Sequence, residues 1–219
     1  MQNVLDYLDS ADLALYVNPV ALTPDRVSWH AYNPAAEFMT SRQHATIKQY
    51  RHWLRNGMYS ALLYDASILQ ITYTVSDGKV IGHRLAYVPC PFDIDQDLLR
   101  SGEPVDDIIG LYDRAADVAL RSPVRFDYDP ATARAGHPAA HLTINSPDCR
   151  IACVAPLHVQ RFVDFVFRHF YQSLWKAHQP FFAAAAWRHL GDSIIDEEDR
   201  HLPHVTWNTR AVASHFASF

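Results

Sequence analysis

The hydrophobic period of residues 119–176 changes once, and this change constrains the fold more than any other feature of the chain. Apolar and polar residues alternate over 124–128, and the alternation returns over 142–144 and 151–153. A period of two residues predicts strands that bury one face. The spacing then becomes helical, with an apolar stripe made of Val159, Phe162, Val163, Val166, Phe170 and Leu174. We therefore predict three short strands whose apolar side lies beneath one long helix over residues 157–176.

A second strong signal is the dipeptide Asp77-Gly78, which lies between two runs of strand-forming residues. Asp-Gly is typical of the tight turn that joins antiparallel strands. The remaining pattern predicts strands at 26–32, 59–64, 68–75, 80–88 and 204–207, and helices at 2–16, 41–56, 104–116 and 181–190. The fold class that follows is α+β. We expect an antiparallel sheet of about five to seven strands, packed on one face by the long helix of the C-terminal half and by the N-terminal helices.

Length and charge set the broad class of protein. A chain of 219 residues that is 49% hydrophobic can bury one sizeable core, so we expect a single domain over residues 1–219. A net charge of −5 argues against a nucleic-acid coat or a protein that binds anionic membranes. The sequence contains no run of eighteen apolar residues and no basic signal segment at its start. With three cysteines, an odd and sparse set, these features favour a cytoplasmic protein with reduced thiols and no membrane partner.

The polar side of the predicted strands carries the candidate functional residues. Arg125, Asp127 and Asp129 alternate with apolar residues on one strand, and His141 and Arg150 take the same side of the next two. This row could be a carboxylate pair with arginines that hold an anion. It could equally be a ladder of ion pairs on a solvated face, which is the commoner role of charged rows. We expect this face to be open to water, because the helix covers the other side.

The spacing of His137 and His141, four residues apart, would suit a metal on one face of a helix. Pro138 and the strand pattern that follows argue against a helix there. The alternative is that His137 caps a turn and His141 forms a hydrogen bond across the sheet. The sequence also lacks the zinc-protease, dinucleotide-binding, P-loop and nucleophile-elbow motifs, so we expect no metal and no cofactor.

The long helix contains more aromatic residues than one sheet face needs. Most of them belong to the core, but Phe165 or Phe167, Trp175 and the following Phe-Phe-Ala-Ala-Ala-Ala-Trp segment could form an exposed apolar patch. Such a patch is typical of an interface, so we expect a protein partner or a homo-oligomer.

The order of several short motifs resembles an uncharacterised bacterial family that is catalogued as a domain of unknown function. The motifs are Arg-Phe-Asp-Tyr at 125–128, His-Pro at 137–138, His-Leu at 141–142, Cys-Arg-Ile at 149–151 and Phe-Val-Phe-Arg-His-Phe-Tyr at 165–171. The resemblance covers residues 100–175 well and implies a bacterial protein encoded among mobile-element or phage-defence genes, with no established activity. The Arg-aromatic-Asp strand before a His-bearing turn is also similar to small toxin ribonucleases, from which this chain departs in its length and in Pro138.

Two functional hypotheses follow. In the first, the protein is an accessory or adaptor subunit that acts by protein–protein interaction. In the second, it is a ribonuclease-like enzyme or toxin with RNA as its partner. His141 or His137 would then take the 2′-hydroxyl proton, Arg125 and Arg150 would stabilise the charged phosphorane, and Asp127 would orient the base.

Overall fold

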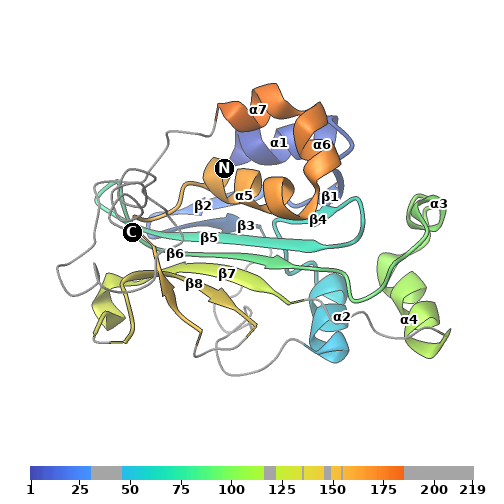
Figure 1. Cartoon of the computed structure of the whole chain (residues 1–219), viewed down its shortest axis with the longest axis horizontal. Coiled ribbons are helices and arrows are strands. Elements are labelled where there is room, and N and C mark those ends of the chain that lie inside the picture. Colours follow the sequence, from blue (N-terminus) through green and yellow to red (C-terminus); the bar gives the residue numbers. More distant parts are fainter. Residues whose placement is uncertain (31–45, 116–121, 135, 146–148, 154, 185–219) are drawn as a thin grey trace, which may run out of the picture.

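The computed structural model describes residues 1–30, 46–115, 122–134, 136–145, 149–153 and 155–184. Within these residues, nine strands form one antiparallel sheet with helices on both faces (Figure 1). The α+β class and the antiparallel sheet are confirmed. The sheet has more strands than the five to seven expected, because short strands extend it at both edges.

The strands occur in the order β1-β4-β5-β6-β7-β8-β9 across the sheet, and the β2–β3 hairpin joins β5 through β3. Their bounds are β1 Ala14–Val17, β2 Val20–Thr23, β3 Arg26–Trp29, β4 Ala61–Leu63, β5 Ile68–Ser76, β6 Lys79–Val88, β7 Val124–Tyr128, β8 Ala140–Ile144 and β9 Ile151–Ala152. The two longest strands, β5 and β6, pair over their whole length through the Asp77-Gly78 turn. The predicted hairpin is therefore confirmed.

The helices lie on both sides of this sheet. Their bounds are α1 Gln2–Ser10, α2 Ile47–Arg55, α3 Gln96–Leu99, α4 Val105–Ala115, α5 Val159–Phe170, α6 Gln172–Ala177 and α7 Gln179–Ala183, with a short 3-10 turn at Pro130–Thr132. Helices α1, α5, α6 and α7 lie on one side and α2 and α4 on the other (Figure 1). The expectation that all N-terminal helices share one face is therefore wrong for α2.

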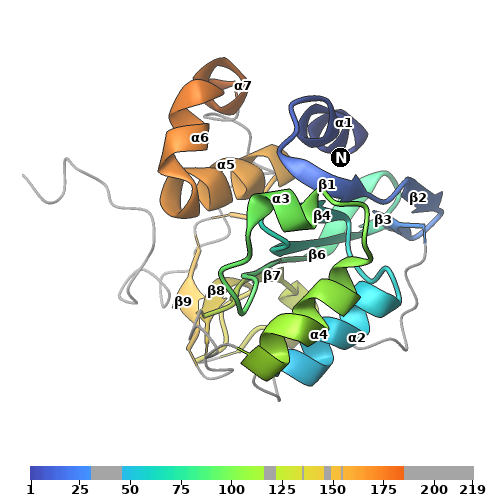
Figure 2. The same ribbon diagram turned by 90° about the vertical axis from the view of Figure 1, so that its right-hand side faces the viewer.

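The position of α2 follows from the alternation of the strands. Its buried residues Tyr50 and Trp53 pack with Ile68, Ala86 and Val88, whose side chains point away from α5. The side chains between them, such as Leu69 and Leu85, pack with the α1–α5 side. Two apolar cores therefore flank the sheet. Figure 2 shows α2 beside α4, and Arg51 and Arg55 of α2 both form ion pairs with Asp106 of α4.

Two predicted helices end earlier than expected. The helix predicted over 2–16 stops at Ser10, because Asp12 adopts a positive φ of 55° and residues from Ala14 on pair with β4. The helix predicted over 157–176 breaks at Tyr171, which has non-helical backbone angles and whose hydroxyl donates a hydrogen bond to Asp65 Oδ2 at 2.8 Å. The strand predicted at 204–207 and most of the helix at 181–190 lie outside the described residues.

The β5–β6 turn gives a simple test of the fold. Asp77 and Gly78 both have positive φ, and a Cβ added at Gly78 would meet nothing within 4 Å. We expect Gly78→Ala to lower the free energy of unfolding by about 1 kcal/mol through backbone strain alone. Urea unfolding measures this difference. The neighbouring exposed change Lys79→Ala is the control and should stay within about 0.5 kcal/mol; equal losses in both variants would contradict the assignment to backbone strain.

Candidate functional site

The polar residues of the central strands meet in one row across the sheet. Strand pairing places Asp127 of β7 opposite Arg84 of β6 on one side and opposite His141 of β8 on the other. Arg125 lies two residues before Asp127 and so projects from the same face. The predicted grouping of Arg125, Asp127 and His141 on one face is thus present in the structure. We call these three residues with Arg84 the polar cluster.

Asp127 is the centre of the polar cluster. The Nε of Arg125 donates a hydrogen bond to Asp127 Oδ2 at 2.6 Å, and the Nε2 of His141 lies 3.5 Å from the same oxygen. The Nε of Arg84 lies 3.8 Å from the second oxygen, Oδ1. One carboxylate thus faces two guanidinium groups, and the cluster has a positive balance when His141 is neutral.

The tautomer of His141 follows from its other contact. Its Nδ1 lies 2.8 Å from the carbonyl oxygen of Pro138, which only accepts hydrogen bonds, so Nδ1 carries the proton. Burial lowers the pKa of His141, and the nearby Asp127 carboxylate offsets part of this effect. The neutral ring turns the lone pair of Nε2 toward Asp127. The expected hydrogen bond of His141 therefore goes to the loop before its own strand rather than across the sheet.

The polar face is buried, which corrects the expectation of a face open to water. Arg125, Asp127 and His141 are exposed to only 6, 7 and 4%. Helices α2 and α4 lie on this side of the sheet (Figure 1). The sheet therefore has helices on both faces, and not only on the face that packs against α5. Arg84 is the exception, since 53% of its side chain is exposed. The cluster therefore meets water mainly through Arg84.

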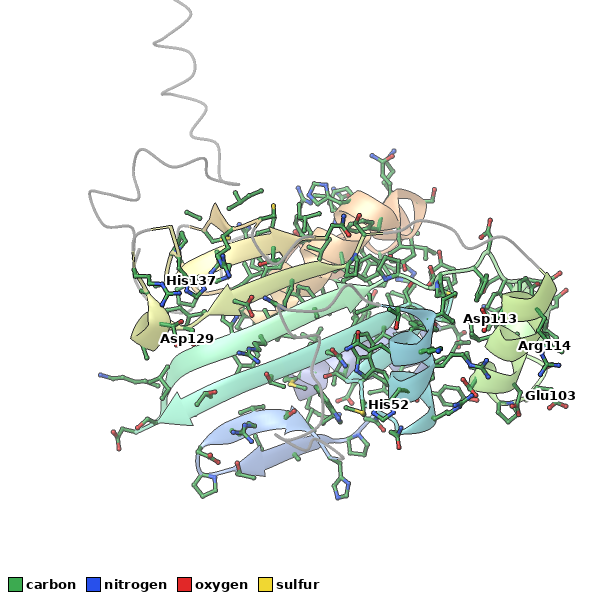
Figure 3. All side chains as sticks on the ribbon, turned by 90° about the horizontal axis from the view of Figure 1, so that it is seen from below. His52, Glu103, Asp113, Arg114, Asp129 and His137 are labelled. Carbon is green, nitrogen blue, oxygen red and sulfur yellow. The ribbon has the colours of Figure 1, made fainter. Side chains whose placement is uncertain are left out.

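The other three predicted site residues lie around the cluster. His137 is half-buried, and its ring centre lies 5.0 Å from that of His141. Asp129 is half-buried at the start of the 3-10 turn, and Figure 3 shows its side chain near the same end of the sheet as His137. Arg150 is half-buried just before β9, and alternation with Ala152 places it on the side of His141. Asp129 lies just beyond the end of β7, at the start of the 3-10 turn.

Sequence reasoning missed Arg84, which completes the ion pairs of Asp127. The alternation of β6 could have placed Arg84 on a polar face, but the pattern of one strand does not say which strands are its neighbours. Within the described residues, no group of three or more His, Cys, Asp or Glu side chains could hold a metal ion.

A second candidate surface is the sheet edge formed by β1 and β2. Residues 13–24 contain no charged side chain, although Asp12 and Asp25 flank them. We call residues 13–24 the uncharged edge. Leu22 is 75% exposed and Tyr16 is 49% exposed, and both rank among the exposed large apolar side chains of the described chain. Strand β1 pairs only with β4, and β2 only with β3, so one side of each strand has no partner strand in the described structure.

Most side chains of the predicted aromatic patch that the structure describes are buried or half-buried, and residues 185–187 of the Phe-Phe-Ala-Ala-Ala-Ala-Trp segment lie outside the described residues. Phe167 is fully buried, and Trp175 is half-buried with its Nε1 donating to Asp164 at 2.8 Å. Phe165 is also half-buried, with its ring edge-on to Phe126. Phe170 remains 43% exposed. The surplus of aromatic residues is thus used mainly for packing between helix and sheet.

Comparison with known proteins gives one result. The family described as "Uncharacterized conserved protein (DUF2290)" matches residues 13–207 of the chain. No curated protein and no solved structure matches. In the described part of the chain, no helix has both the length and the apolar character needed to cross a membrane.

Proposed function

We propose that this chain, which belongs to the family described as "Uncharacterized conserved protein (DUF2290)", is an accessory or adaptor subunit that binds a strand of another protein at its uncharged edge. The observation that carries the proposal is the absence of charge over residues 13–24, together with the exposure of Leu22 and Tyr16. The cytoplasm of a bacterium is the proposed setting. The three cysteines are free thiols, as is usual in a reducing compartment.

The physical argument concerns the backbone of edge strands. An edge strand presents N–H and C=O groups that a further strand can bind, and soluble proteins usually prevent this with charged residues, prolines or bulges. Here Pro19, Pro24 and one irregularity in the pairing of β1 are present, but no charge is. An added strand would gain main-chain hydrogen bonds, and exposed apolar side chains would supply contact area. We commit to an extended, uncharged segment of a partner protein as the occupant.

The polar cluster supports catalysis less well. A ribonuclease needs an imidazole that reaches the 2′-hydroxyl group, but His141 is buried and points one nitrogen at Pro138 and the other toward Asp127. The guanidinium of Arg125 is bonded to the same carboxylate. Of the two candidate histidines, His137 is the partly accessible one. Loss of RNA cleavage or of toxicity on His137→Ala, in a variant that stays folded, would favour the ribonuclease alternative over the adaptor.

Charge placed on the uncharged edge tests the adaptor proposal. We expect Leu22→Lys and Tyr16→Lys each to weaken partner binding by at least about tenfold, because strand addition would bury a lysine against an apolar segment. Native pull-down from the source cells, with quantitative mass spectrometry, measures the partner retained by each variant. Mass photometry of the pure protein reports whether the occupant is instead a second copy of the chain.

The chain offers a matched control. Leu111 on α4 is 59% exposed and lies outside the edge, so Leu111→Lys makes the same chemical change elsewhere. This variant should retain the partner. Equal loss in all three variants, or no loss in the two edge variants, would overturn the proposal. Recovery of a dimer that the edge variants dissociate would replace the partner protein by a second copy.

A further inference from the structure

The two strands of the uncharged edge follow one another along the same side of the sheet. Strand β1 pairs with β4, which pairs with the beginning of β5. Strand β2 pairs with β3, which pairs with a later part of β5. Because every one of these pairings is antiparallel, β1 and β2 both run in the direction of β5. A strand that is added at this edge therefore meets both of them.

The main-chain groups of β2 that point away from the sheet can be assigned from one hydrogen bond. In an antiparallel strand, the N–H and C=O groups of one residue face one neighbour, and those of the next residue face the other way. The N–H of His30 donates to the carbonyl oxygen of Pro19 at 2.9 Å, so Pro19 and every second residue after it face β3. Val20 and Leu22 therefore turn their main-chain groups outward.

The same rule shows where the register of the edge changes. The N–H of Asn18 donates to the carbonyl oxygen of Ser60 at 3.0 Å, so the main-chain groups of Val17 point outward. Val17 and Val20 lie three positions apart, whereas the groups on one side of a regular strand recur every two residues. A regular strand that is bonded to β2 is therefore out of register at β1. There the exposed Tyr16 offers apolar contact instead.

One outward group of β2 already has an acceptor from outside the sheet. Gln2 is the first residue of α1, and its Oε1 accepts a hydrogen bond from the N–H of Val20 at 3.4 Å. The Nε2 of the same amide donates to Asp6 Oδ1 at 2.6 Å, which leaves the oxygen to face the edge. A side-chain amide offers the same kinds of donor and acceptor as a peptide group. Gln2 thus lies where the carbonyl group of an added strand would bind.

From these contacts we infer that the partner strand forms main-chain hydrogen bonds with Val20 and Leu22, and that its peptide carbonyl replaces the amide of Gln2. This inference rests on the proposed function, to which it adds a register and a competing group within the chain. Gln2 is exposed and its bond to Val20 is long, so its amide can be released into water at little cost. Main-chain recognition accepts many sequences, provided that the segment is extended.

Amide hydrogen exchange, followed by nuclear magnetic resonance in the full chain without a partner, tests the assigned register. The N–H groups of Ala21 and Thr23 face β3, whereas that of Leu22 faces outward. We expect Ala21 and Thr23 to exchange at least about tenfold more slowly than Leu22, because hydrogen-bonded amides are protected. Equal exchange rates at the three positions would overturn the inference.

A synthetic peptide of alternating threonine and valine, with a lysine at each end, serves as the probe. We expect it to bind the full chain at millimolar concentration and to slow the exchange of the Val20 and Leu22 amides. Gln2→Ala should bind the peptide about two- to fivefold more tightly, because the competing amide is removed. Gln172→Ala is the matched control, since Gln172 is also exposed and is the first residue of α6, and it should bind normally.

Two substitutions at one position separate the main chain from the side chain. Leu22→Pro removes the outward N–H, and β2 should tolerate it because this group is not bonded to β3. We expect this variant to bind the peptide at least about tenfold more weakly, whereas Leu22→Ala keeps the N–H and should lose less than about threefold. Thermal unfolding checks that both variants remain folded.

Three binding results would overturn the inference. They are the absence of peptide binding, equal losses in Leu22→Pro and Leu22→Ala, and unchanged affinity in Gln2→Ala. The proposed function is judged separately, by partner retention in Leu22→Lys and Tyr16→Lys. If the lysine variants lose the partner protein but Leu22→Pro retains it, the edge is the interface and main-chain pairing at β2 is not its basis. If the lysine variants retain the partner, the proposed function itself fails.

Discussion

Replacing Asp127 with alanine is expected to lower the free energy of unfolding by about 3–5 kcal/mol. The change leaves the guanidinium of Arg125 buried beside a neutral side chain, since Asp127 accepts its 2.6 Å hydrogen bond. A buried charge that loses its counter-ion keeps the desolvation penalty and loses the attraction that offset it. Urea unfolding at pH 7 measures the loss, provided that the slope of the transition is unchanged.

The control is Asp129→Ala, two residues further along the chain. Asp129 is half-buried, and its side chain does not cap the turn that follows. Removal of this carboxylate should change the stability by less than about 1 kcal/mol. The double variant Arg125→Met/Asp127→Leu should recover part of the loss, because removing both charges also removes their desolvation penalty. A loss below about 1 kcal/mol for Asp127→Ala would show that the cluster contributes little to stability.

The protein is also expected to lose about 3 kcal/mol of stability between pH 6.5 and pH 4 through one histidine, His83. Burial lowers the pKa of His83 to about 4, and the Asp127 carboxylate offsets only part of this shift. The unfolded chain, with an ordinary histidine pKa near 6.5, therefore binds the proton more readily than the folded chain. This contribution is fully present above pH 6.5 and is lost as the pH falls through 4.

The structure explains why the folded protein disfavours the protonated ring. The backbone N–H of Leu157, just before α5, donates to His83 Nε2 at 2.8 Å. The ring centre lies 5.7 Å from those of Tyr73 and Tyr128. A proton on Nε2 would remove the acceptor of Leu157 and place a cation in this buried site. The unprotonated ring of His83 on β6 thus accepts a hydrogen bond from the segment just before α5.

The test is the pH dependence of urea unfolding in the native protein and in His83→Gln. Glutamine can accept from Leu157 but does not titrate, so the variant should lose stability less steeply below pH 6.5. Acidic groups such as Asp106, whose pKa is lowered by Arg51, contribute equally to both proteins and cancel in the comparison. His141, whose pKa is also lowered by burial, contributes to the slope that remains in the variant. Parallel pH profiles for the two proteins would refute the role of His83.

Prediction from the sequence was most successful where the pattern was local. The hairpin at Asp77-Gly78 depends on a turn dipeptide and two flanking strands, and it is present with the expected pairing. The alternation over 124–128 and 142–144 correctly placed Arg125, Asp127 and His141 on one side of the sheet. These results follow because strand alternation is a property of the backbone itself.

Prediction failed where distant parts of the chain decide the outcome. The helical stripe of residues 157–176 continues through Tyr171, but the helix breaks there into α5 and α6. At the break, Tyr171 forms a hydrogen bond with Asp65, which lies more than a hundred residues away in the sequence. The pattern of residues 41–56 predicted a helix but did not show which face of the sheet α2 packs against. The number of aromatic residues in and after α5 suggested an exposed patch, because the sequence does not show how much of each ring is buried against other elements.

The sequence by itself determined the fold class, the central hairpin and which residues share the polar side of β7 and β8, because these depend on local periodicity and turn chemistry. Only the tertiary structure decided that this side is buried, that Arg84 completes the ion pairs of Asp127, and that charge is missing from an edge. Alternation separates two faces of a strand, but neighbouring strands and covering layers come from remote parts of the chain. Pairing of β7 with β6 and β8 brings Arg84 and His141 beside Asp127, and burial of this face makes the polar residues a buried cluster.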